Sequence, residues 1–224
     1  EMCIRDRALS MLNTNLDLAI TDYVTVDFNA IIECVDLLGG VDITITDDEA
    51  SLMIGYMKEL NELTGHNSTP PASCGTYTLD GVQACAYARI RYGGGDDYRR
   101  TERQRTVLTA MMQKAQKSNI LTLNKLINAA FGDIQTSFSN TDLLALATKV
   151  FSYDIGDTTG FPYEKTTHKY DKIGDVVIPC DLASNVTQLH QFLFNDENYT
   201  PSATVLSNSQ QIISNTGYKQ GDGH

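Results

Sequence analysis

Apolar residues recur along this chain at two spacings, one typical of helices and one typical of strands. Spacings of three and four residues, which put side chains on one helix face, occur over residues 28–38 and 182–194. Alternation of apolar and polar residues, typical of half-buried strands, occurs over residues 23–28 and 41–46. These patterns predict strands interspersed with helices.

Start and stop signals extend this prediction along the chain. Gly39-Gly40 ends the first helix, and Asp47 or Asp48 is placed to cap a helix that runs to about Leu63. Asp80 and Gln83 have the spacing of a capping box at the start of a short helix. The other expected elements are the end of a helix at 8–15, helices at 98–117, 121–131, 140–150 and 202–218, and strands at 134–138 and 176–178. Asn140 is expected to cap the helix at 140–150. No Gly/Ser/Pro-rich linker divides the chain, so we expect an α/β fold, a single layered domain with a central mixed sheet flanked by helices.

The overall charge makes one basic segment stand out. The 224 residues carry a formal net charge of -11, yet six of the eight arginines lie between Arg89 and Arg105. Nucleic-acid binding requires a broad basic surface, so this composition argues against a nucleic-acid partner. The guanidinium group is a planar fork of N–H donors suited to phosphate oxygens, so a local anion site is expected.

Helical spacing divides this segment into two faces. One face of the predicted helix is expected to point toward the protein interior, and the second half of this stripe is apolar. Its residues are Arg100, Arg103, Gln104, Val107, Leu108 and Met111. Arg99, Glu102, Arg105 and Thr106 lie off the stripe and are predicted to meet solvent, and Asp96 or Asp97 is a candidate N-cap. The alternative is a solvated helix start in which Asp97 and Glu102 pair with the arginines.

Other common site types lack their motifs. The chain has no GxxxxGK[ST] phosphate loop, no G-x-S-x-G nucleophile and no C-x-x-C pair. His190 lies on an apolar helix face and is interpreted as a structural histidine. Cys34 and Cys85 lie among apolar residues and are expected to be buried thiols.

The sequence from Leu79 to Gln104 resembles one bacterial family. Its segments LDGVQACAYARIR and GDDYRRTERQR resemble the motifs of the LytR-CpsA-Psr (LCP) family of cell-envelope enzymes, with Asp97, Tyr98, Arg100, Thr101, Arg103 and Gln104 in register. YVTVDF, VDLLGGVDI and VVIPCDLASNVTQLHQFLF extend the resemblance, which covers roughly residues 8–218. Cys85 departs from it, because the family usually has leucine there.

The resemblance implies a domain organisation and a location. Residues 1–7 match nothing in the family and are interpreted as a non-native leader, residues 8–218 as the LCP catalytic domain without its N-terminal part, and residues 219–224 as a tail. Family members lie on the extracytoplasmic face of the cell membrane, anchored by an N-terminal helix that we expect to precede this sequence. We therefore expect this chain to be inactive in transfer by itself. In an oxidising compartment, the two loop cysteines Cys74 and Cys180 are predicted to form a disulfide.

The resemblance also implies a reaction. LCP enzymes are phosphotransferases that move a glycan phosphate from a polyprenyl-pyrophosphate carrier onto peptidoglycan, the glycan being teichoic acid, capsule or a related polymer. Alternatives are a non-catalytic module that binds phosphorylated envelope lipids or glycans, and a polyprenyl-pyrophosphate pyrophosphatase.

Residue roles follow from the matched motifs. Catalytic roles are predicted for Asp97, Arg100 and Gln104, with Asp97 either a base or a group that positions an arginine. The predicted pyrophosphate-binding residues are Arg89, Arg91, Arg100, Arg103 and Gln104. Val107 and Met111 are candidates for the wall of a prenyl-binding tunnel, although core packing explains them equally well. Mg²⁺ is the implied cofactor, with its ligands expected in the missing N-terminal segment.

Overall fold

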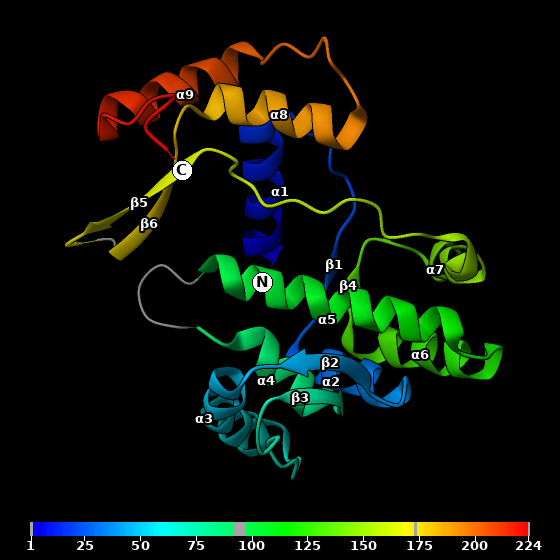
Figure 1. Cartoon of the computed structure of the whole chain (residues 1–224). Helices are drawn as coiled ribbons and strands as arrows, with labels where there is room; N and C mark the ends of the chain where they lie inside the picture. The colour runs from blue at the N-terminus through cyan, green and yellow to red at the C-terminus, as the bar shows by residue number, and fades with distance from the viewer. Residues whose placement is uncertain (1, 92–96, 173, 224) are drawn as a thin grey trace. The chain divides into compact units, whose positions relative to one another are not determined.

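A computed structural model describes residues 2–91, 97–172 and 174–223 of the chain, and Figure 1 shows it as a cartoon. The chain forms two compact units. The large unit comprises residues 22–156, and the small unit comprises residues 1–21 and 157–224.

The large unit contains most of the elements predicted from the sequence. Its elements are β1 (Val24–Thr25), α2 (Phe28–Leu37), β2 (Val41–Ile45), α3 (Asp47–Thr64), β3 (Gly75–Leu79), α4 (Gly81–Arg89), α5 (Asp97–Lys117), α6 (Ile120–Asp133), β4 (Gln135–Thr136), α7 (Asn140–Thr148) and the 3-10 turn η1 (Val150–Ser152). The predicted helices at 28–38, at 81–89 and in the arginine-rich segment are confirmed. Strand β3 was not predicted, although Tyr77 and Leu79 alternate with polar residues.

Strands β2 and β3 form an antiparallel pair that packs one face against the large unit's core. The register runs from Val41 opposite Leu79 to Ile45 opposite Gly75. Along β2 the side chains alternate between buried and exposed, as a half-buried strand requires. Buried residues of α2, α3, α4 and α5 complete the core around this pair (Figure 1).

Gly81 allows α4 to approach α2 closely. A Cβ at this position would lie 2.3 Å from the Ile32 carbonyl oxygen and 2.6 Å from the Ile32 Cα. The Gly81 N–H also donates to the Asp36 carboxylate at 2.7 Å. The glycine of the LDG motif is therefore required by the distance between two helices.

Two predicted helix caps are wrong by one residue. Thr46, rather than Asp47 or Asp48, caps α3 in a capping box with Glu49, because its hydroxyl reaches the third N–H of the helix. Ser139, rather than Asn140, caps α7 in the same way with Asp142. Asp47 instead accepts a hydrogen bond from the Cys74 N–H at 2.7 Å.

The small unit combines a strand pair with three helices. Its elements are α1 (Met2–Leu16), β5 (Lys165–Tyr170), β6 (Gly174–Pro179), α8 (Leu182–Phe194) and α9 (Ala203–Thr216). Its core is formed by Leu182, Val186 and Val205, where α8 and α9 lie side by side (Figure 1). The prediction of α8 is confirmed residue for residue, whereas β5 was not predicted.

His190 has the structural role predicted for it. The side chain is buried, its Nε2 lies 2.8 Å from the Leu16 carbonyl oxygen, and its ring stacks on Tyr199. The Tyr199 hydroxyl donates to Asp17, which also accepts from the Ser202 N–H at 2.8 Å. These contacts join the end of α1 to α8 and to the start of α9 within the small unit.

The described strands form three antiparallel pairs, β1–β4, β2–β3 and β5–β6, rather than one central mixed sheet. The predicted class, strands flanked by helices, is confirmed. None of the described helices is long and apolar enough to cross a membrane.

The cysteines are only partly as predicted. Cys85 is buried as predicted, whereas Cys34 is half-buried. Cys74 lies in the large unit and Cys180 in the small unit, both as free thiols, and the bridge between them stays a prediction. Cys180 lies in the bend between β6 and α8, as predicted for a loop cysteine, and its side chain is fully buried with Sγ 4.0 Å from the Ile178 carbonyl oxygen.

Candidate functional site

The arginine-rich segment forms the first turns of α5, and its buried stripe is narrower than predicted. Arg103, Val107 and Ala110 are buried, with exposed fractions of 6%, 3% and 8%. Gln104 is exposed, and Leu108 is 62% exposed. The helix is therefore rotated relative to the predicted stripe, so that Arg103 and Gln104 face different surroundings.

Only part of the predicted N-terminus of α5 lies within the described residues. Asp96, one of the two candidate N-caps, lies outside the described residues, as do Gly93, Gly94 and Gly95. Asp97 is the first residue of α5, and its side chain lies outside the described part of the structure. Its predicted role as base or positioning group stays a prediction.

An apolar cavity of about 430 Å³ lies beside α5 in the large unit. Helices α2, α4 and α5 contribute most of its wall. Its lining residues are Val26, Phe28, Ala30, Ile31, Cys34, Cys85, Ala88, Arg89, Gln104, Val107, Leu108, Met111 and Ile134. The cavity brings together four predicted site residues: Arg89, Gln104, Val107 and Met111.

The two cysteines in this wall are neutral at physiological pH. Burial raises the pKa of Cys85 to about 11, despite the opposing effect of Arg89. Burial also raises the pKa of Cys34, and the charge of Glu33 adds to the shift. Protonated thiols behave as small apolar groups, so they keep the wall apolar.

Arg89 is the cation in this wall, and one end of its guanidinium lacks a partner. Its Nη2 donates to Glu59 at 3.1 Å, and the guanidinium lies over the rings of Phe28 (4.7 Å to the centroid) and Tyr56 (5.6 Å). Its Nη1 is buried and has no hydrogen-bond partner among the described residues. A buried charged donor left unpaired is costly, by roughly 1–3 kcal/mol or more. An anionic group at this end of the cavity would remove that cost.

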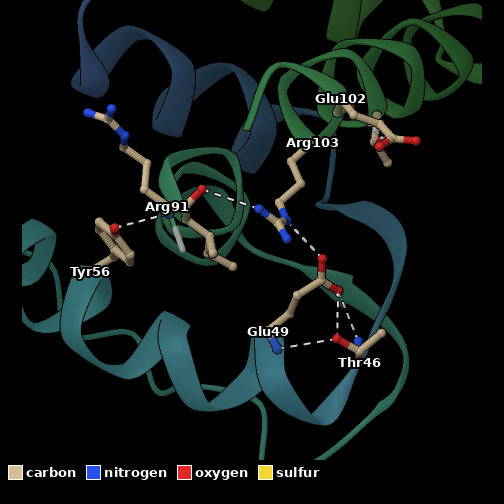
Figure 2. A network of polar contacts seen from close by, with 8 residues as sticks. Thr46, Glu49, Tyr56, Arg91, Glu102 and Arg103 are labelled. Atoms are coloured by element: carbon tan, nitrogen blue, oxygen red, sulfur yellow. Dashed lines mark hydrogen bonds and ion pairs between the residues drawn. The ribbon is translucent and has the colours of Figure 1, made fainter. Parts of the chain in front are cut away.

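Arg103 is held by protein groups. Its Nε donates to a Glu49 carboxylate oxygen at 2.8 Å, and its Nη1 donates to the Ile90 carbonyl at 3.3 Å (Figure 2). The Arg103 and Glu49 side chains are only 7% and 13% exposed. Burial alone would raise the pKa of Glu49, but hydrogen bonds from Arg103 and Thr46 outweigh it and hold the pKa below its usual range.

A second cavity, of about 380 Å³, lies on Arg103's side of α5. Its wall is mostly polar, in contrast to the apolar cavity beside Gln104. The residues that line it are Thr46, Asp48, Glu49, Tyr87, Arg99, Glu102, Arg103 and Thr106. Arg103 therefore lines the polar cavity, whereas the predicted pyrophosphate ligands Arg89 and Gln104 line the apolar cavity.

The remaining two predicted arginines line neither cavity. Arg100 is half-buried on α5. Arg91 is exposed, and its backbone N–H donates to the Tyr56 hydroxyl at 3.1 Å (Figure 2). Tyr56 and Glu49 were not identified from the sequence, although the Thr46–Glu49 spacing is that of a capping box and could have indicated Glu49.

Metal-ligating side chains do not form a cluster among the described residues. No group of three or more His, Cys, Asp or Glu side chains in this part of the chain could hold a metal ion. The predicted Mg²⁺ and the place of its ligands stay a prediction.

The fold and the apolar cavity define an α/β protein with a site suited to an apolar chain that carries an anionic group. The LytR_cpsA_psr family model matches residues 5–172. This match includes the arginine-rich motif and the whole cavity, and it covers well over half of the chain. The chain belongs to this family.

Individual curated relatives are consistent with this assignment. The chain is 27% identical over 151 residues to the polyisoprenyl-teichoic acid–peptidoglycan teichoic acid transferase TagV of Bacillus subtilis, covering 63% of the chain and 34% of TagV. The chain spans between 30% and 51% of the length of the curated relatives compared with it.

Solved structures share the fold. A transcriptional regulator from Enterococcus faecalis superposes with a TM-score of 0.67 at 17% identity, covering 96% of this chain and 74% of that one. TagT bound to LI-WTA superposes with a TM-score of 0.58 at 18% identity, covering 95% and 67%.

Proposed function

We propose that this chain is the lipid-pyrophosphate-binding part of a phosphotransferase that moves a glycan phosphate from a polyprenyl-pyrophosphate carrier onto peptidoglycan. The observation that carries the proposal is the unpaired Nη1 of Arg89 in the wall of an otherwise apolar cavity. Such a cavity fits a ligand with an apolar chain and an anionic head. Several relatives are named as teichoic acid transferases, and TagT has been solved bound to LI-WTA.

In this proposal, Val107 and Met111 contact the prenyl chain. Leu108 and the neutral thiols of Cys34 and Cys85 extend the same apolar wall. Each buried methylene of a prenyl chain contributes about 0.8 kcal/mol, so a cavity of this size can contribute much of the affinity.

Arg89 and Gln104 bind the pyrophosphate where it emerges from the cavity, and Arg91 and Arg100 complete the anion site from outside it. A hydroxyl of the acceptor sugar attacks the phosphorus that carries the glycan. The bond from that phosphorus to the bridging oxygen breaks, prenyl monophosphate leaves, and the hydroxyl proton passes to a base. Guanidinium and amide donors stabilise the charge that develops on the phosphate oxygens. Asp97 is the proposed base or the group that positions an arginine.

The proposal also includes a location and a cofactor. We place the site on the extracytoplasmic face of the membrane, attached through a helix that precedes this sequence, with teichoic acid, capsule or a related polymer as the glycan. Mg²⁺ is the proposed cofactor, with ligands outside the described residues.

A product analysis tests the reaction. A form extended upstream is incubated with a polyprenyl-pyrophosphate-linked glycan, with and without peptidoglycan oligomers, and lipid and sugar products are separated. We expect two products, prenyl monophosphate and peptidoglycan that carries the glycan phosphate. Both should form when peptidoglycan oligomers are present, and neither should form without them. Prenyl monophosphate without acceptor modification would support the pyrophosphatase instead, and tight binding without turnover would support a binding module.

A further inference from the structure

The two polar groups of a single peptide unit, between Ile90 and Arg91, are each held by a side chain from elsewhere in the large unit. The Ile90 carbonyl accepts from Arg103 of α5 at 3.3 Å. The Arg91 N–H donates to the Tyr56 hydroxyl of α3 at 3.1 Å. Figure 2 shows both contacts. Since a peptide unit is planar, fixing both of its polar groups fixes the orientation of the whole plane.

This peptide lies where the chain leaves helix α4. Helix α4 ends at Arg89, and Ile90 leaves it with an extended ψ of 126°. The Ile90 side chain is fully buried, and its packing holds the backbone in place between Arg89 and Arg91. Arg91 follows Ile90 directly, so the orientation of this peptide influences the direction in which the Arg91 side chain leaves the backbone.

Arg103 is in turn held by a carboxylate that is itself fixed at both oxygens. One Glu49 oxygen accepts from Arg103 at 2.8 Å, and the other accepts from the Thr46 N–H at 3.0 Å and the Thr46 hydroxyl at 3.2 Å. Glu49 is therefore tied to the first turn of α3 through the capping box. The contacts run from the start of α3, through Arg103, to the Ile90 carbonyl.

We infer that Glu49, Arg103 and Tyr56 are positioning residues that aim Arg91 at the pyrophosphate. On this account Arg103 does not bind phosphate itself, because its guanidinium is buried between Glu49 and the Ile90 carbonyl. This inference rests on the proposed function, since it assumes that Arg91 contacts the pyrophosphate.

A double-mutant cycle on ligand binding tests the inference. Tyr56→Phe removes the hydroxyl but keeps the ring that lies 5.6 Å from the Arg89 guanidinium. The 224-residue chain is titrated with geranylgeranyl pyrophosphate for the unaltered protein, Tyr56→Phe, Arg91→Ala and the double variant. Arg91→Ala is expected to weaken binding roughly ten- to a hundredfold, and Tyr56→Phe about three- to tenfold. In the Arg91→Ala background, Tyr56→Phe is expected to change affinity by less than about twofold, because the side chain that it aims is gone.

Glu49→Gln is carried through the same cycle and is expected to show the same dependence on Arg91. Tyr77→Phe is the matched control, since Tyr77 is another half-buried tyrosine whose hydroxyl donates to a loop carbonyl, that of Ser73, at 3.1 Å. It is expected to leave affinity unchanged. Hydrogen exchange of the Arg91 amide in the ligand-free protein is expected to accelerate in Tyr56→Phe, while that of the Gly81 amide does not.

The outcomes separate the two proposals. If the unaltered chain does not bind geranylgeranyl pyrophosphate, the proposed function fails and the role of Arg91 fails with it. If the chain binds, but Tyr56→Phe weakens binding equally in both backgrounds, the positioning role alone is overturned. Unchanged exchange of the Arg91 amide in Tyr56→Phe would also overturn it.

Discussion

Replacing Glu49 by glutamine should destabilise the protein in a way that depends on pH. Glutamine keeps the size of the side chain but offers one acceptor oxygen, whereas the carboxylate accepts from both Arg103 and Thr46. Removing one charge of a buried pair typically costs about 3–5 kcal/mol, because the other charge remains buried. For a chain of this length, we expect a fall in the unfolding midpoint of roughly 6–20 °C at pH 7.

The pH dependence follows from the direction of the pKa shift. The folded-state pKa of Glu49 lies below its ordinary value of 4.5, so its stabilising contribution is complete above that pH. The contribution is lost as the pH falls through the folded-state pKa. The difference in unfolding free energy between the two proteins should therefore be largest at neutral pH and shrink as the pH falls through the lowered folded-state pKa of Glu49.

Chemical denaturation from pH 7 to pH 3 measures this difference directly. Lys114→Ala is the control: it removes the ion pair between Lys114 of α5 and Asp42 of β2, which is more exposed than the Arg103–Glu49 pair, and it should change stability little at any pH. A difference between the unaltered protein and the Glu49→Gln variant that stays constant across this range would refute the reasoning.

Three further results are expected. Gly81→Ala should destabilise the large unit by about 1–3 kcal/mol in denaturant melts, since its Cβ would meet the backbone of α2; an unchanged midpoint would contradict the close approach. In transfer assays on the extended form, Arg100→Lys should be nearly as damaging as Arg100→Ala, about 10²–10³ in rate, because lysine lacks the fork that bridges two phosphate oxygens. Arg99→Ala should be mild, and equal losses at both positions would show that the two side chains share one site. Geranylgeranyl pyrophosphate should slow maleimide labelling of Cys34, which lines the apolar cavity, but not of exposed Cys74; equal rates with and without ligand would exclude the cavity as its site.

Local patterns predicted the helices well because their causes are local. The apolar spacing and Gly39-Gly40 were sufficient for α2, and the capping box of Asp80 and Gln83 for α4. Strand β3 and the caps of α3 and α7 were missed. Thr46 and Ser139 precede residues that are themselves good caps, and only the backbone angles decide among them.

The site was harder to predict because it depends on contacts between distant residues. Arg89, Gln104, Val107 and Met111 were predicted, and they do line one cavity. The periodicity of α5 could not show that Arg103 faces away from Gln104, because an ideal stripe places neighbouring residues on one broad face. Glu49, the partner of Arg103, lies 54 residues earlier in the chain, and no local sequence pattern links these two residues.

The most direct test of the central claim is the affinity of this chain for geranylgeranyl pyrophosphate, geranylgeraniol and inorganic pyrophosphate, measured by calorimetry with and without Arg89→Ala. If the apolar cavity and Arg89 act together, geranylgeranyl pyrophosphate binds more tightly than geranylgeraniol and more tightly than inorganic pyrophosphate. Arg89→Ala then weakens binding of the pyrophosphate-bearing lipid roughly ten- to a hundredfold and leaves binding of geranylgeraniol unchanged. Equal affinities for the lipid with and without its pyrophosphate, or an Arg89→Ala variant that binds both lipids as the unaltered protein does, would contradict the account.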